Sequence, residues 1–411
     1  MRSEQSHTDT KHEPQQAGHR RLHLTIKLRT ATQILALLGS ALLCHTGLNA
    51  QTATSKHAIV AYVFPQNAVL QPGDIAANKL TRINYAFANI KGGKIIDGFP
   101  TTAANLAALT ALKRQNPSLT VLASVGGWTW SGNFSDVALT PQSRAIFIDS
   151  VVAFVERYNL DGLDIDWEYP GMVGAGNHFR PEDKQNYTLL LKELRQRFNR
   201  EEKRLHRRLF ITIATGASKE FLDHTEMAEV QKYVDTVNLM AYDYYEPGSE
   251  PTTGHHAPLL TNPDDPKHIS ADNSVREYEQ AGVPAAKVVL GVPFYGHVWG
   301  QVPATNHGLF QPGQPIPNAF AKYSDISNTM FASGFTRYWD ATAAAPYLYN
   351  PQKQIFVSYE DPESLALKSK YLLDHHLGGI MFWEYSADPS GALLDAIDKG
   401  LGQPAAQKAV K

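Results

Sequence analysis

Three acidic residues alternate with two apolar ones in a short segment made of Asp164, Ile165, Asp166, Trp167 and Glu168. The segment predicts a strand, on which successive side chains point to opposite faces. The three carboxylates therefore lie on one face, with neighbours roughly 6.5–7 Å apart along the backbone. Because buried like charges resist simultaneous ionisation, at least one carboxyl group should keep its proton near neutral pH, as a general acid requires. Glu168, last in the row, is the candidate proton donor.

Two other interpretations of this acidic row have to be weighed. A salt-bridged interior would require basic residues on neighbouring strands, but the candidate strands contain only Arg82, at the start of its run. A hard-cation site is the second alternative, because carboxylate oxygens are good ligands for Ca²⁺ or Mg²⁺. No cluster of histidines with carboxylates accompanies the row in the sequence, so no metal and no cofactor are expected.

Aromatic residues accompany the candidate strand ends. Flat aromatic faces at the mouth of a barrel suit stacking on sugar rings, whereas packing in the core is the alternative for any one of them. The tryptophans within or just after candidate strands are Trp128, Trp130, Trp167, Trp299 and Trp383.

Further polar groups follow two of the candidate strands. Ser124 precedes the glycine pair Gly126 and Gly127, which permits a tight turn or a close backbone approach. A second segment, residues 240–245, adds more polar and aromatic groups to the same rim. The scattered histidines are expected to be surface or packing residues; examples are His255, His256, His375 and His376.

These residues need a scaffold of alternating strands and helices. From Ala58 onward, apolar runs alternate with segments of helical period, which favours βα units around a parallel sheet. The candidate strands are 59–64, 82–87, 120–125, 160–168, 209–215, 236–242, 288–294 and 379–384. The candidate helices are 102–115, 142–158, 182–199, 220–233, 274–281 and 361–375. Eight strands favour a closed (β/α)₈ TIM barrel in the α/β class, although periodicity alone also fits an open doubly wound sheet.

One stretch, 300–355, interrupts this alternation with many Pro, Asn, Gly and aromatic residues and no clear crossover helix. Loops of that length without structure of their own are uncommon in compact domains, so a small inserted subdomain is expected. Its candidate strands lie at 334–339 and 354–359.

Composition and charge narrow the partners. The chain has 411 residues, is 43% hydrophobic and carries a formal net charge of −2, which disfavours nucleic acid as a partner. An apolar run at 34–44 follows Lys27 and Arg29 and is too short for the roughly 20 residues that span a bilayer. It predicts a secretory signal that ends at Ala50, with a buried helix as the alternative.

Together these residues resemble glycoside hydrolase family 18, whose signature of three aspartates and a glutamate is matched by Asp161, Asp164, Asp166 and Glu168. Similar motifs follow in order at 85–87, 124–127, 240–243, 291–296 and 381–384. The stretch before the last strand resembles the small α+β insertion that chitinases of one subgroup carry between strands 7 and 8. The divisions implied are an N-terminal extension with signal at 1–50, a barrel at 51–296 and 356–402, an insertion at 297–355 and a tail at 403–411.

The resemblance implies a role for each matched residue. Glu168 would protonate the glycosidic oxygen, while Asp166 would hold the substrate's N-acetyl group, whose own oxygen attacks the anomeric carbon. Asp164 would share a proton with Asp166, and Tyr242 would hydrogen-bond the acetamido group. Further substrate contacts would come from Trp383, Asp243, Met240, Tyr295, Trp128, Tyr85, Gly127 and Tyr169. Asp161, Ser124 and Gly126 would support the site.

The expected function is that of a secreted, monomeric chitinase, extracellular or periplasmic, acting on chitin or N-acetylglucosamine oligosaccharides without stable membrane insertion. Two alternatives stay open: an endo-β-N-acetylglucosaminidase on N-glycans or wall glycan, and a chitinase-like lectin that binds without cleaving.

Overall fold

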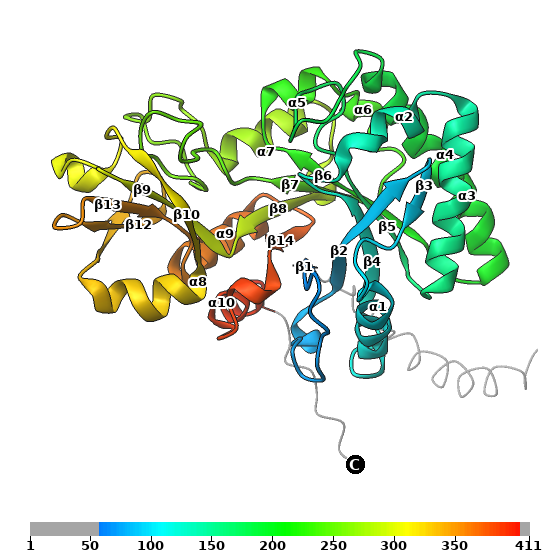
Figure 1. Cartoon of the computed structure of the whole chain (residues 1–411), viewed down its shortest axis with the longest axis horizontal. Helices are drawn as coiled ribbons and strands as arrows, with labels where there is room; N and C mark the ends of the chain where they lie inside the picture. The colour runs from blue at the N-terminus through cyan, green and yellow to red at the C-terminus, as the bar shows by residue number, and fades with distance from the viewer. Residues whose placement is uncertain (1–56, 403–411) are drawn as a thin grey trace, which may run out of the picture. The chain divides into compact units, whose positions relative to one another are not determined.

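Eight parallel strands close into a barrel in the part of the chain that the computed structural model describes, residues 57–402. They follow the order β1-β14-β8-β7-β6-β5-β4-β2, and pairing of β1 with β2 completes the ring (Figure 1). The bounds are β1 Ala58–Val63, β2 Arg82–Lys91, β4 Thr120–Gly126, β5 Gly162–Asp166, β6 Phe210–Gly216, β7 Thr236–Met240, β8 Val288–Pro293 and β14 Gly379–Trp383. The barrel prediction is confirmed, and the doubly wound alternative is wrong. The expected signal segment and tail lie outside the described residues.

Alternation along the strands separates an apolar outer face from a more polar interior. On β5, Leu163 and Ile165 join the large core cluster shared with the surrounding helices, while Asp164 and Asp166 take the opposite face. Every residue of β5 is buried. The acidic row therefore points into the barrel, as its spacing predicts.

The helices mostly follow the expected pattern. Their bounds are α1 Thr102–Ala111, α2 Phe134–Ala138, α3 Pro141–Arg157, α4 Asp183–Leu205, α5 Lys219–Asp223, α6 Met227–Val230, α7 Ala271–Gln280, α9 Pro362–Asp374 and α10 Ala392–Gly400. Among these described helices, none is long and apolar enough to cross a membrane.

One helix prediction is wrong, because the segment 220–233 is not continuous. Thr225 donates its hydroxyl hydrogen to the Phe221 carbonyl over 2.8 Å. Glu226 then leaves the helical region, with φ −107° and ψ 63°. The backbone therefore breaks into α5 and α6 between these residues.

A second, antiparallel sheet lies between β8 and β14 in the chain, as the expected insertion requires. Its order is β10-β9-β13-β12-β11, and Figure 1 colours it yellow to orange. The bounds are β9 Tyr295–Gly300, β10 Gln314–Lys322, β11 Thr336–Asp340, β12 Ala345–Asn350 and β13 Ile355–Ser358, with the short helix α8 at Tyr323–Asp325. Sequence patterns missed β10 because Pro315 and Pro317 interrupt it, which an edge strand tolerates. A short antiparallel strand, β3 Lys94–Ile96, extends β2.

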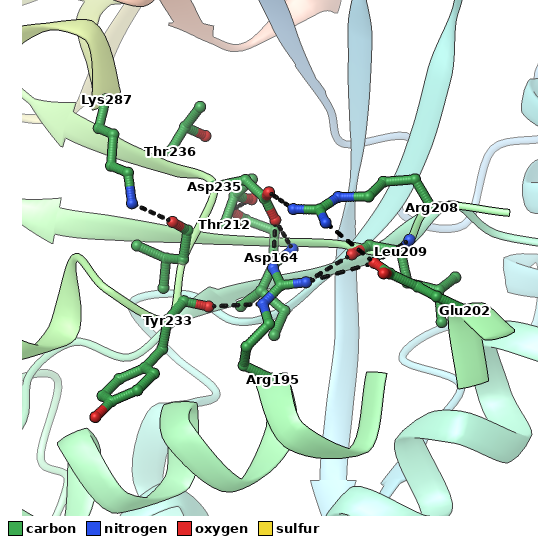
Figure 2. Close-up of polar contacts among 12 residues, drawn as sticks. Asp164, Arg195, Glu202, Arg208, Leu209, Thr212, Tyr233, Asp235, Thr236 and Lys287 are labelled. Atoms are coloured by element: carbon green, nitrogen blue, oxygen red, sulfur yellow. Dashed lines mark hydrogen bonds and ion pairs between the residues drawn. The ribbon is translucent and has the colours of Figure 1, made fainter. Parts of the chain in front are cut away.

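An ion-pair network ties α4 to the chain just before β6 and β7 (Figure 2). Arg195 donates hydrogen bonds of 3.0 Å to the carbonyls of Tyr233 and Leu209 and pairs with Asp235. The Asp235 carboxylate also accepts the Ile211 amide over 2.8 Å. The arginine thereby satisfies two carbonyls and one carboxylate that packing removes from solvent.

Candidate active site

Asp164 lies deepest in the acidic row and is surrounded by donors from four other strands. Tyr62 on β1 and Ser124 on β4 donate to one oxygen over 2.9 and 2.7 Å. Asn238 on β7 donates to the other oxygen over 3.2 Å, as does Thr212 on β6. Burial raises the pKa of Asp164, and these hydrogen bonds oppose the rise.

Asp166 is buried beside a second carboxyl group and has few partners of its own. Its side chain is 4% exposed, and its Oδ1 has no hydrogen-bond partner in the structure. Burial raises its pKa well above the ordinary value, and repulsion from Glu168 and Asp164 adds to the rise. The pair formed by Asp166 and Glu168 should therefore hold at least one proton near neutral pH.

Glu168 follows β5 at the floor of the cleft. Burial raises its pKa to about 7; a hydrogen bond with Tyr169 lowers it, and the negative charges of Asp243 and Glu246 raise it. Its backbone amide donates to the Ser131 hydroxyl oxygen over 3.0 Å, which fixes the start of the loop. The carboxyl group is therefore partly protonated at neutral pH, unlike an ordinary glutamate.

Asp243 forms a second polar centre in the same cleft. Tyr295 donates to its Oδ1 over 2.6 Å, and His297 Nε2 lies 2.8 Å from the same oxygen. Burial would raise the pKa of Asp243, but the neighbouring imidazoles of His256 and His297 outweigh burial and bring it below the ordinary value. Asp243 is thus ionised in the folded protein at neutral pH. Its side chain is 35% exposed and lines the cleft.

Aromatic rings form the floor and rim. Trp383, at the end of β14, stacks on Phe87 with ring centroids 5.5 Å apart and contacts Phe64 at 5.4 Å. Trp128 stands at the rim and is 52% exposed, which is unusual for so large an apolar side chain. The cleft has a volume of about 810 Å³.

The glycine pair after β4 allows that loop to lie against the end of β5. Gly126 has φ +105°, and a Cβ there would come within 2.2 Å of the Asp166 carbonyl oxygen. The Gly127 amide donates to that same oxygen over 2.8 Å. A side chain at Gly126 would therefore push away the residue that carries the Asp166 carboxylate.

The structure brings most of the expected residues together in one cleft. Asp166, Glu168, Tyr169, Met240, Tyr242, Asp243, Tyr295, Trp128 and Trp383 line it. Asp164 lies in the barrel interior and Ser124 donates to it, whereas Asp161 lies before β5, where it accepts the Val121 amide and pairs with Lys113.

Some expectations about the cleft are wrong. Tyr85 is fully buried outside the cleft, and its hydroxyl contacts Thr102 of α1 over 3.0 Å, because alternation along β2 turns it toward the helices. Gly127 does not line the cleft either and acts through its backbone amide. Trp167 stacks on Phe134 at 5.2 Å in the core, and Trp299 is fully buried in the second sheet, so neither reaches the cleft.

Sequence reasoning also missed contributors to the site. His256, expected to be a packing residue, is buried with its Nδ1 3.6 Å from the Asp243 carboxylate. His297 reaches the same carboxylate from β9, and Tyr62 reaches Asp164 from β1. The alternation of Tyr62 with buried Ala61 and Val63 was the one signal that could have placed it inside the barrel.

Comparison with known proteins agrees with this geometry. The family model for glycosyl hydrolases family 18 matches residues 58–388. Chitinase A1 from Niallia circulans is 36% identical over 389 residues, covering 80% of this chain and 56% of that protein. The chain thus spans little more than half the length of that relative.

Two solved structures are similar in both sequence and fold. Chitinase ChiW from Paenibacillus sp. str. FPU-7 gives a TM-score of 0.80 at 40% identity, over 84% of this chain and 33% of that one. A family 18 N-acetylglucosaminidase from Paenibacillus barengoltzii gives a TM-score of 0.76 at 41% identity, over 84% of this chain and 99% of that one. With the barrel and the acidic row in place, the chain belongs to glycosyl hydrolases family 18.

Proposed function

We propose that the protein is a chitinase that hydrolyses β-1,4 linkages between N-acetylglucosamine units of chitin or its oligosaccharides. The observation that carries the proposal is Glu168, a buried carboxyl group at the cleft floor whose pKa is raised to about 7. A group with this pKa is about half protonated at pH 7 and can give its proton to a leaving oxygen. The names of the similar chitinases support the choice of substrate.

The proposed mechanism is retaining and substrate-assisted. Glu168 protonates the glycosidic oxygen as the bond to the anomeric carbon breaks, and the substrate's acetamido oxygen attacks that carbon. Asp166 accepts a hydrogen bond from the acetamido N–H, which its unpartnered Oδ1 favours. Water then opens the cyclic intermediate, and Glu168 takes back a proton from it.

Neighbouring groups support these two carboxyl groups. Asp164 shares the proton of Asp166 within the barrel. Tyr242 donates its hydroxyl hydrogen to the acetamido oxygen; burial and nearby carboxylates raise its pKa well above the ordinary value, so it keeps that hydrogen. Trp383 forms the floor beneath the sugar and Asp243 binds a sugar hydroxyl.

The proposal includes secretion. It rests on the apolar run at 34–44 after Lys27 and Arg29, with Ala50 as the last residue removed. The remaining chain would divide into a barrel at 51–296 and 356–402, an insertion at 297–355 and a tail.

A second candidate function is that of an N-acetylglucosaminidase that releases single sugars from the chain end. It is favoured by the likeness to the Paenibacillus barengoltzii enzyme, which the chain matches over 99% of its length. The two candidates share the same chemistry and differ in the products they release.

The test is hydrolysis of defined N-acetylglucosamine oligomers, followed by mass spectrometry for product length and NMR for the anomer formed. Wild-type protein should release products with retained configuration, and Glu168→Gln should lower the rate at least ~100-fold because it removes the acid. The matched control is Glu182→Gln, an exposed glutamate beside α4, which should keep the wild-type rate.

The products separate the candidates. Dimers or longer products indicate a chitinase, whereas monomers alone indicate the N-acetylglucosaminidase. Undiminished hydrolysis by Glu168→Gln would contradict the mechanism, and wild-type binding without any product would instead assign a lectin.

A further inference from the structure

Asp243 and His297 line the cleft, and the buried His256 lies beside them; Asp243 and His256 come from the loop after β7 and His297 from β9. Their candidate ligand atoms all lie within 4.8 Å of one another. We propose that these three residues form a binding site for a divalent transition-metal ion of the Zn²⁺ type.

The spacing of the ligand atoms fits such an ion. Zinc bonds to imidazole nitrogen and carboxylate oxygen at about 2.0–2.2 Å, so two ligand atoms of a tetrahedral site lie roughly 3.3 Å apart. His297 Nε2 lies 2.8 Å and His256 Nδ1 lies 3.6 Å from Asp243 Oδ1, which brackets that value. Small side-chain rotations would equalise the two distances.

His256 provides an independent sign of a missing partner. The side chain is fully buried, and neither ring nitrogen has a hydrogen-bond partner in the structure. Buried imidazoles normally satisfy their nitrogens, and a neutral imidazole offers one lone pair to a metal. The Nδ1 atom faces the Asp243 carboxylate, so that lone pair can point into the proposed site.

The surroundings favour a cation and leave room for a fourth ligand. Glu246 lines the same cleft wall and adds a second carboxylate. Two lysines near the site already have partners: Lys267 donates to the Tyr244 carbonyl over 2.8 Å and pairs with Glu250, and Lys368 donates to the Ala257 carbonyl over 2.7 Å and pairs with Glu360. Asp243 is 35% exposed, so water can complete the coordination shell. Two histidines with one carboxylate and an open position form a donor set typical of zinc.

Tyr295 gives the proposed site an outer partner. Its hydroxyl donates to Asp243 Oδ1 over 2.6 Å and orients the carboxylate. An ion bound here would engage the carboxylate that the proposed function assigns to a sugar hydroxyl, so the metal and the sugar would compete for Asp243.

The test is calorimetric titration of ZnCl₂ into the full chain after treatment with a chelator and its removal. His297→Gln and His256→Asn should each weaken Zn²⁺ binding at this site at least ~10-fold. Loss of a residue that only orients a metal ligand already lowers metal affinity by about that factor, and loss of the ligand itself should lower it at least as much. Because the chain also carries histidines before the described residues, such as His7, the readout is the difference in binding between wild type and variant. Binding needs no turnover, so the result is independent of the proposed hydrolysis.

The matched control is His178→Gln. His178 also lies near an aspartate, Asp136, at 3.2 Å, but this pair is exposed and outside the cleft. The control should bind Zn²⁺ as the wild type does. Equal Zn²⁺ binding by wild type and His297→Gln would overturn the proposal. The His297 side chain is partly exposed, so weaker binding by this variant would not be explained by misfolding. Circular dichroism checks that buried His256→Asn remains folded.

Discussion

At the scale of single residues, the character of Glu168 comes from its neighbours. A carboxyl group in water ionises well below neutral pH, whereas burial beside Asp166, together with the charge of Asp243, keeps the proton on Glu168 up to about pH 7. A group whose folded pKa is raised is protonated below that pKa and loses its proton as the pH rises through it. Activity that depends on this proton must therefore fall on the alkaline side.

The first prediction concerns this pH dependence. The kcat/KM for hydrolysis should fall about tenfold per pH unit above about pH 7, since only protonated Glu168 acts as the acid. In Asp243→Asn the alkaline limb should move to lower pH, because the negative charge that raises the Glu168 pKa is gone. A pH–rate profile measured at low substrate concentration checks both statements.

Asp374→Asn is the control, since it removes the same charge from an exposed site next to Lys370. Its profile should match that of the wild type. An unmoved alkaline limb in Asp243→Asn would refute the electrostatic coupling between Asp243 and Glu168.

At the scale of elements, the barrel strands carry the acidic residues, and a helix holds the chain segments that lead into two of these strands. α4 is the longest described helix and joins the chain before β6 and β7 through Arg195 (Figure 2). Its side chain is 11% exposed and its partner Asp235 is 16% exposed. Removing one partner of a largely buried ion pair is more costly than removing an exposed one.

The second prediction is therefore about stability. Arg195→Met should lower the free energy of unfolding by about 3 kcal/mol, because it leaves the Tyr233 and Leu209 carbonyls without this donor and removes the more buried of the two arginines that pair with Asp235. Arg208→Met is the matched control: Arg208 pairs with the same aspartate at 2.6 Å but is 54% exposed, so its loss should cost less than ~1 kcal/mol. Urea unfolding followed by circular dichroism measures both; equal losses would show that burial of Arg195 is not the cause.

At the scale of the described molecule, the cleft combines the barrel's strand ends with β9 of the second sheet. Tyr295 and His297 come from β9, whereas Trp128 comes from the loop after β4. The wall and the rim are thus built by segments far apart in the sequence. An exposed tryptophan on such a rim offers a face for stacking a sugar ring.

The third prediction follows from this exposure. Trp128→Ala should raise KM for N-acetylglucosamine oligomers about tenfold, equivalent to ~1.4 kcal/mol of stacking, with a smaller effect on kcat. Phe331→Ala is the control, because Phe331 is also exposed, at 44%, but does not line the cleft. Steady-state kinetics on the two variants tests the claim, which fails if both variants keep the wild-type KM.

The sequence by itself determined the acidic row and the number of barrel strands, and it indicated an insertion before the last strand. These features depend on short-range patterns: alternation along β5 puts Asp164 and Asp166 on one face whatever the rest of the chain does. The same alternation along β2 predicts that Tyr85 points outward, toward the helices. The resemblance to the family had instead suggested that Tyr85 contacts the substrate.

Only the tertiary structure decided which residues meet across the barrel. The four donors to Asp164 come from four strands, and the partners of Asp243 come from β9 and from the loop after β7. Closure of the barrel and docking of the second sheet bring these groups within hydrogen-bond distance, and neither is encoded in local spacing. The raised pKa of Glu168 and the cluster of Asp243 with His256 and His297 arise from that closure, since desolvation and charge act through space.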